Sequence, residues 1–182
     1  MKLLSLLLFL LLLAMLAKTY VFAFRSQSPR DYADQTPQFD LTKHLSGELL
    51  SEGVVFGPNG KMTTSFVARM VGEWQGDTGT LSEEFTYSNG TTQSRKWNLK
   101  LGTGNRFTAT ADDLVGEAQG VISGSTVQIS YEIILPDSAG GHTLKATDWL
   151  YLTADGAIMN KSEMRKFGLK VAELVATMRP VD

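Results

Sequence analysis

The 182-residue chain has no cysteine and only two histidines, His44 and His142. Disulfides, thiolate metal sites and cysteine nucleophiles are therefore excluded, and a zinc site would need carboxylate ligands in place of the usual Cys and His pattern. Neither sign of charge is in large excess: the chain has 17 Lys and Arg and 19 Asp and Glu, and no basic cluster stands out. We therefore predict no metal site, no cofactor and no nucleic-acid partner.

The longest apolar run follows Lys2 and extends from Leu3 to Ala17. These 15 residues are too few to cross a hydrocarbon core of ~30 Å as a helix. Small residues at the −3 and −1 positions of Val21-Phe22-Ala23 complete the layout of a secretory signal peptide. The alternative is an uncleaved anchor over Leu3 to Phe24, with Lys18 reaching the membrane interface.

Both alternatives carry the rest of the chain across the inner membrane. The predicted organisation is a signal peptide or anchor over residues 1–23, a polar tether over 24–39 and one β domain over 40–182. A domain of that length buries roughly two-thirds of its unfolded surface. We expect a periplasmic protein, either soluble or anchored by its N-terminal helix.

From Asp40 onward, short alternating runs are separated by turn residues, after a brief helical turn around Leu41–Leu45. The clearest run places Val127, Ile129, Tyr131 and Ile133 on one face, with polar residues between them. About ten such strands predict an antiparallel meander that forms a barrel or a sandwich. A barrel is favoured because closure removes exposed edges. A barrel of eight to ten strands holds one small ligand or fills with side chains.

The central hairpin is predicted from residues 81–87, a Ser88-Asn89-Gly90 loop and residues 91–101. A three-residue loop with glycine in the left-handed position is a common hairpin connection. It pairs Tyr87 with Thr91 and therefore brings Glu83 opposite Arg95.

This register places one acidic and one basic side chain on an otherwise apolar face. In one interpretation, Arg95 binds a carboxylate or phosphate head group and Glu83 orients its guanidinium. In the other, the two form an internal salt bridge that fixes the hairpin register. Losing one partner of such a buried pair costs roughly 3–5 kcal/mol.

Two further acidic sites have open roles. Asp112-Asp113 has three possible roles: an acid/base pair, half of a cation site, or a turn. The turn is favoured, because Asp is common in turns and because adjacent residues on a strand point to opposite faces and so do not easily act on one substrate. Asp148 lies two residues before Leu150 and therefore on the same face of its strand, so its carboxylate is expected to point into the barrel. Its partner there is either Arg95 or Lys166.

Four aromatic side chains, Trp97, Tyr131, Trp149 and Tyr151, are candidates to line an apolar pocket. Their polar atoms suit contact with a head group. They are equally suited to an ordinary barrel core.

Several spaced motifs resemble the DUF3833 family of bacterial domains of unknown function. They are Glu83-x-Phe85-x-Tyr87-x-x-Gly90, Arg95-x-Trp97, Asp112-Asp113-Leu114-Val115-Gly116-x-Ala118-x-Gly120, Asp148-Trp149-Leu150-Tyr151, Asn160 and Lys166-Phe167-Gly168. The resemblance implies a secreted, lipocalin-like or calycin-like barrel of undetermined activity, found in gene neighbourhoods with enzymes that modify membrane fatty acids. Many relatives resemble lipoproteins. This chain has no cysteine for lipid attachment, so any anchoring would come from the leader helix.

Three functional hypotheses follow. The first is a barrel that binds an apolar or acyl-bearing small molecule for a membrane-lipid process, with Arg95 on the head group, supported by Glu83. The second is an isomerase or hydratase in which Glu83 and Asp148 perform acid/base chemistry. The third is a solid barrel without catalysis that docks on the membrane surface or on an inner-membrane lipid enzyme.

Overall fold

The structure, a computed structural model, describes residues 2–21 and 23–181. Its helical elements are α1 (Lys2–Val21), η1 (Phe24–Ser26), η2 (Pro29–Tyr32), α2 (Leu41–His44) and η3 (Asp137–Ala139). Its strands are β1 (Gly47–Phe56), β2 (Met62–Gln75), β3 (Thr78–Tyr87), β4 (Thr92–Leu101), β5 (Arg106–Thr110), β6 (Ala118–Ser123), β7 (Thr126–Ile134), β8 (Thr143–Leu152), β9 (Ile158–Lys166) and β10 (Leu169–Pro180).

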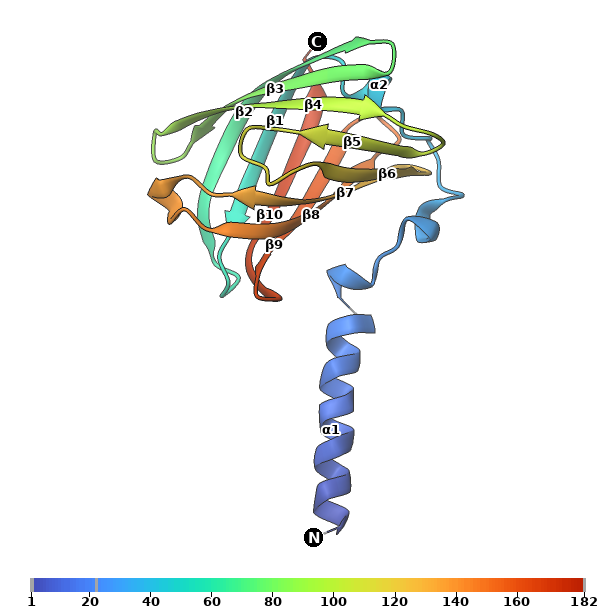
Figure 1. The fold of residues 1–182 in the computed structure, drawn as a ribbon, viewed down its shortest axis with the longest axis vertical. Helices are drawn as coiled ribbons and strands as arrows, with labels where there is room; N and C mark the ends of the chain where they lie inside the picture. Colours follow the sequence, from blue (N-terminus) through green and yellow to red (C-terminus); the bar gives the residue numbers. More distant parts are fainter. Residues whose placement is uncertain (1, 22, 182) are drawn as a thin grey trace.

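The ten strands form one closed antiparallel barrel in which each strand pairs with its neighbours in sequence (Figure 1). Strand β1 closes the ring by pairing with both β2 and β10. The predicted all-β meander, with a barrel in place of a sandwich and an N-terminal apolar helix, is confirmed. Closure leaves no free sheet edge, which is the physical advantage that favoured it.

The central hairpin has the predicted register. The backbone N–H of Tyr87 donates to the carbonyl of Thr91 at 2.9 Å, and Glu83 faces Arg95 across β3 and β4. Because alternate residues face opposite sides of a strand, this register fixes which residues enter the barrel.

One end of the barrel is closed by the segment that precedes β1. The predicted helical turn forms α2, and Asp40 caps it by accepting from the backbone N–H of Thr42. Behind the turn, the carbonyl of Leu45 accepts from Trp74 Nε1 at 2.9 Å. A Cβ at Gly72 would lie 1.9 Å from this same carbonyl oxygen, so only glycine permits the contact.

The other end is the mouth of the barrel. In a meander, successive turns alternate between the two ends, so the β1–β2, β3–β4, β5–β6, β7–β8 and β9–β10 connections all lie at the mouth. Figure 1 shows the β1–β2 and β9–β10 turns on the side from which α1 leaves the domain. The two ends therefore differ in what covers them.

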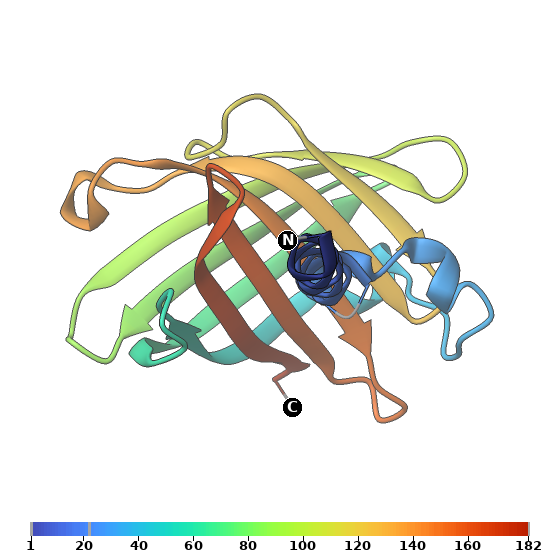
Figure 2. The same ribbon diagram turned by 90° about the horizontal axis from the view of Figure 1, so that it is seen from below.

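The segment predicted as a polar tether packs on the outside of the barrel. Ser123 Oγ donates to the carbonyl of Pro29, and the ring of Tyr32 lies 5.2 Å from that of Trp149. Figure 2 shows this segment beside the barrel wall, with α1 projecting towards the viewer.

Helix α1 exposes its leucines along its length, from 82% at Leu3 to 46% at Leu16. In the described part of the chain, no helix reaches the length and hydropathy that a membrane crossing requires. The predicted cleavage motif includes Phe22, which lies outside the described residues, as does the side chain of Lys18. Cleavage and export stay predictions.

Candidate functional site

A polar layer crosses the barrel interior between its two ends. Glu83, Arg95, Tyr131 and Asp148 enter it from β3, β4, β7 and β8. Strand alternation places each on the inward face. The structure thus brings together four of the seven predicted site residues, and Trp97 packs directly against them.

This layer separates two kinds of interior. Towards the closed end, the large inward side chains are apolar and buried, with the polar Asn160 among them: Leu49, Phe107, Val127, Leu150 and Ile158. Towards the mouth, several inward side chains are only half-buried: Val55, Phe85, Tyr87, Leu114, Ile133 and Leu174. The polar layer is therefore the floor of the less tightly covered half.

Arg95 is the centre of the layer. Its Nε donates to Asp113 Oδ1 at 3.1 Å, and its side chain is 14% exposed. The guanidinium carbon lies 4.1 Å from the ring centre of Trp97 and 5.7 Å from that of Tyr131. The cation therefore lies against the Trp97 ring and beside the Tyr131 ring, and the two rings meet edge-on with their centres 5.4 Å apart. Such contacts stabilise a cation when water is excluded.

The ionic partner of Arg95 differs from the prediction. Among the described residues, Arg95 pairs with Asp113 and not with Glu83, although Glu83 faces it in the sheet register. Asp113 lies in the turn between β5 and β6, as predicted for Asp112-Asp113, while Asp112 is exposed. The salt bridge therefore joins the hairpin to the mouth connection and leaves Glu83 as a separate group.

Glu83 is only 7% exposed. Burial raises the pKa of Glu83 from 4.5 to about 7, because the low-dielectric interior disfavours the charged form more than the Arg95 charge and a Trp97 hydrogen bond favour it. Near neutral pH this carboxyl therefore exists in both protonation states.

Asp148 accepts from the Tyr131 hydroxyl at 2.9 Å through Oδ2. Burial also raises the pKa of Asp148 above its usual value, although the neighbouring Ser162 hydroxyl, the Tyr131 hydrogen bond and the Arg95 charge act in the opposite direction. The sequence left Arg95 and Lys166 open as partners of Asp148. Lys166 Nζ lies 5.7 Å from the centre of the Phe167 ring, and Arg95 acts on Asp148 through its charge, while Tyr131 donates the hydrogen bond to Oδ2.

Two polar atoms of the layer have no partner within the described chain. Arg95 Nη2 and Asp148 Oδ1 are both buried and make no hydrogen bond. Buried polar atoms in native proteins almost always have partners, and each exception calls for an explanation. One is a donor and the other an acceptor, so a bound molecule with both functions would satisfy them.

Trp149 and Tyr151 were predicted to surround the interior, and the structure places them on the outer face. They alternate with Asp148 and Leu150, which point inward, so their rings must point outward. There they stack on each other at 6.2 Å beneath Tyr32. Trp149 is only 1% exposed because the N-terminal segment covers it on the outside of the barrel.

Two surface hollows lie away from the polar layer. One is beside Trp74 and Thr78 and the other is beside Glu52 and Thr177. Arg95 and Glu83 line neither of them. Within residues 2–21 and 23–181, no three His, Asp or Glu side chains converge as metal ligands would.

A family profile described as "Protein of unknown function (DUF3833)" matches residues 18–180. The match covers the barrel, the segment before it and every residue of the polar layer. The chain belongs to the DUF3833 family. The resemblance predicted from the spaced motifs is therefore confirmed.

Solved structures share the fold of this DUF3833 barrel at low sequence identity. The S-type phycobiliprotein lyase CPES from Guillardia theta aligns with a TM-score of 0.58 and 8% identity, covering 78% of this chain and 91% of its own. Rv2717c from M. tuberculosis aligns with a TM-score of 0.53 and 13% identity, covering 82% and 100%. No curated protein matches the sequence significantly. These likenesses show the barrel fold alone.

Proposed function

We propose that this DUF3833 protein binds a small molecule with an apolar, acyl-type body and a polar head group, in support of a membrane-lipid process outside the inner membrane. The head group contacts Arg95, and the apolar body extends past the half-buried side chains towards the mouth. The leader helix α1 exports the barrel or tethers it to the membrane.

The observation that carries this proposal is the pair of buried, unpartnered atoms, Arg95 Nη2 and Asp148 Oδ1. An unmet buried donor or acceptor costs about 1–3 kcal/mol, which a ligand repays on binding. A carboxylic acid or a hydroxyl-bearing head group offers an acceptor to the guanidinium and a donor to the carboxylate.

The surroundings of these atoms agree with such a ligand. Asp113 neutralises much of the Arg95 charge, so a neutral or singly charged head group suits the layer better than a multiply charged phosphate. Phe85 and Tyr87 supply apolar surface between the layer and the mouth. Apolar walls with few polar groups are typical of small-molecule sites.

The test is lipid extraction and mass spectrometry on the purified full chain, with displacement of a fluorescent fatty acid as the binding assay. We expect Arg95→Met to weaken binding by about tenfold or more, since a charge-assisted hydrogen bond is lost. Lys96→Met is the matched control, because Lys96 is the exposed neighbour on the outer face of β4. Absence of bound lipid and of probe binding, or equal affinities for both variants, would overturn the proposal.

A second candidate, acid/base catalysis on a bound lipid, is favoured by one observation. The pKa of Glu83, about 7, suits a group that takes up and releases a proton near neutral pH. Turnover of a bound unsaturated or hydroxylated acyl chain that Glu83→Gln abolishes, while ligand binding persists, would support this function. Equal turnover in the variant would exclude it.

A further inference from the structure

The β9–β10 turn presents an aromatic side chain to solvent. Phe167 is 93% exposed and Leu169, two residues later, is 72% exposed. Single exposed apolar residues are common, but two large ones at the tip of one hairpin form a projecting apolar surface. This surface, Phe167 with Leu169, is called the apolar tip below.

Phe167 adopts a backbone conformation, with positive φ, that is unfavourable for a bulky side chain. Lys166 pairs with Leu169, so Phe167 and Gly168 form a two-residue loop with φ of 51° and 80°. Two-residue loops with positive φ at both positions prefer Asn-Gly or Asp-Gly. Among the described residues, Phe167 is the non-glycine residue with positive φ. Strained positions of this kind concentrate at functional sites.

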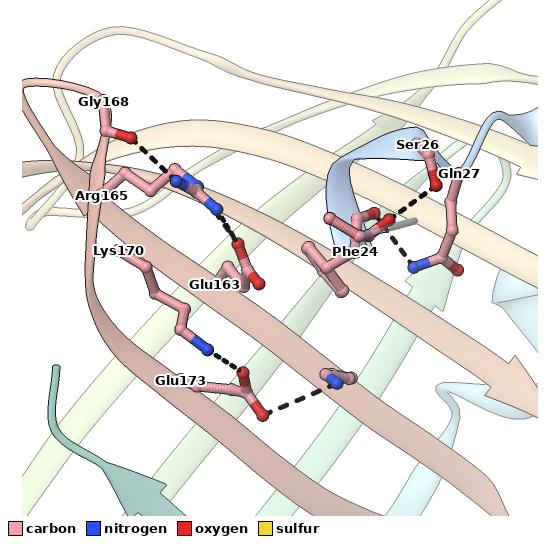
Figure 3. A network of polar contacts seen from close by, with 10 residues as sticks. Phe24, Ser26, Gln27, Glu163, Arg165, Gly168, Lys170 and Glu173 are labelled. Atoms are coloured by element: carbon pink, nitrogen blue, oxygen red, sulfur yellow. Dashed lines mark hydrogen bonds and ion pairs between the residues drawn. The ribbon is translucent and has the colours of Figure 1, made fainter. Parts of the chain in front are cut away.

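Side chains beneath the loop hold it in place. Arg165 Nη1 donates to the carbonyl of Gly168 at 2.8 Å, and Arg165 Nη2 pairs with Glu163 at 2.6 Å (Figure 3). Lys170 pairs with Glu173 at 2.7 Å on the neighbouring strand. The apolar tip is therefore presented on a braced hairpin.

The charge around the apolar tip is positive. Over residues 161–173, which include the turn, the four basic residues Lys161, Arg165, Lys166 and Lys170 outnumber the two acidic residues Glu163 and Glu173. Beside it, Lys61 ends the β1–β2 turn and Met62, the first residue of β2, is 60% exposed. Basic side chains that flank inserted apolar ones suit the surface of an anionic bilayer.

We propose that the apolar tip docks on an anionic lipid surface, with Phe167 and Leu169 at the level of the acyl boundary and the flanking lysines on the head groups. Two features select a membrane over another partner: the positive charge, and the direction of the apolar helix α1, which leaves the domain on this side (Figures 1 and 2). Docking would hold one rim of the mouth against the bilayer. The proposal stands apart from ligand binding at Arg95.

The absence of cysteine allows a test with a single environment-sensitive fluorophore. The full chain carrying Leu169→Cys labelled with NBD is reconstituted in phosphatidylcholine vesicles with and without phosphatidylglycerol. We expect a blue shift and several-fold stronger quenching by nitroxide-bearing lipid in anionic vesicles, weakened by salt. The matched control is the label at Thr103→Cys, an exposed site in the β4–β5 turn at the closed end.

A second variant separates docking from folding. Adding Phe167→Asn to the Leu169→Cys chain should abolish most of the quenching, yet raise the melting temperature, because asparagine tolerates positive φ. Equal quenching at positions 103 and 169, or no loss in the asparagine variant, would overturn the proposal. A blue shift that persists without lipid and grows with protein concentration would assign the apolar tip to a second copy of the chain, which also overturns it.

Discussion

The two ends of the barrel differ in how completely their inward side chains are buried. At the closed end, Phe107 and Ile158 are each only 1% exposed and belong to one buried cluster with Leu41 of α2. At the mouth, Phe85 and Tyr87 stay half-buried above a layer that contains unpartnered polar atoms. Close packing gives stability, whereas unmet polar atoms reduce it.

The difference teaches where to look for function in a barrel without a recognisable motif. Stability is concentrated towards the closed end, so the mouth half can carry charges, strain at Phe167 and half-covered aromatics. Natural proteins break packing rules mainly at functional sites, with compensation elsewhere. The predictions below test whether the two ends differ as much as their burial indicates.

The largest expected effect is at the closed end. Phe107→Ala should lower the free energy of unfolding by about 3–5 kcal/mol, because it opens a cavity in a tightly packed core. Phe85→Ala, the matched change at the mouth, should cost less than half as much, since that ring is only half-buried. Urea unfolding of both variants measures the difference. Equal losses would show that the mouth is as well packed as the closed end.

The next effect concerns the pH dependence of stability. The pKa of Glu83 is raised to about 7 in the folded state, from 4.5, so the folded protein holds this proton more tightly than the unfolded one. Its contribution is therefore present below pH 4.5 and is lost as pH rises through 7, by about 3 kcal/mol.

Glu83→Gln removes this loss, because the amide does not titrate. The variant should match the parent near pH 4 and exceed it in stability near pH 8, by up to about 3 kcal/mol. Glu84→Gln, on the exposed outer face of β3, is the control and should leave the parent profile unchanged. Parallel profiles for Glu83→Gln and the parent would mean that Glu83 ionises normally.

A smaller effect is expected at the ion pair of Arg95. Asp113→Asn leaves the guanidinium without an ionic partner and should cost about 2 kcal/mol of stability. The pKa of Glu83 should fall in this variant, since the negative charge of Asp113 contributes to raising it. Asp112→Asn, the exposed neighbour, should change stability by less than about 0.5 kcal/mol. If both variants behave alike, Asp113 has no structural role at the mouth.

The polar layer was partly predictable because hairpin geometry is local. The Ser88-Asn89-Gly90 loop and strand alternation fix that Glu83 faces Arg95, and the structure has this register. The ionic partner was not predictable in the same way. Asp113 reaches Arg95 because the β5–β6 connection folds back over the mouth and bonds to β7. The sequence of a turn does not predict which distant strand the turn will contact.

The orientation of Trp149 shows the opposite case. Strand alternation with the inward Asp148 already contained the answer, but large aromatic residues are usually assigned to a core. The ring is buried, yet by Tyr32 on the outside of the barrel. Burial of an outward residue depends on a segment more than a hundred positions earlier, which neither periodicity nor composition reveals.

The smallest expected effect tests the cover of the closed end. Asp40 caps α2 through the backbone N–H groups of Thr42 and Lys43, and its pKa is lowered chiefly by the Thr42 hydroxyl. Asp40→Ala should cost about 1 kcal/mol, an effect that fades as acid protonates the aspartate. Hydrogen exchange should speed up near Leu45 but not near Arg95, and Asp34→Ala should leave both unchanged. Faster exchange at Arg95 as well would mean that the two ends open as one cooperative unit, and the division between them would lose its meaning.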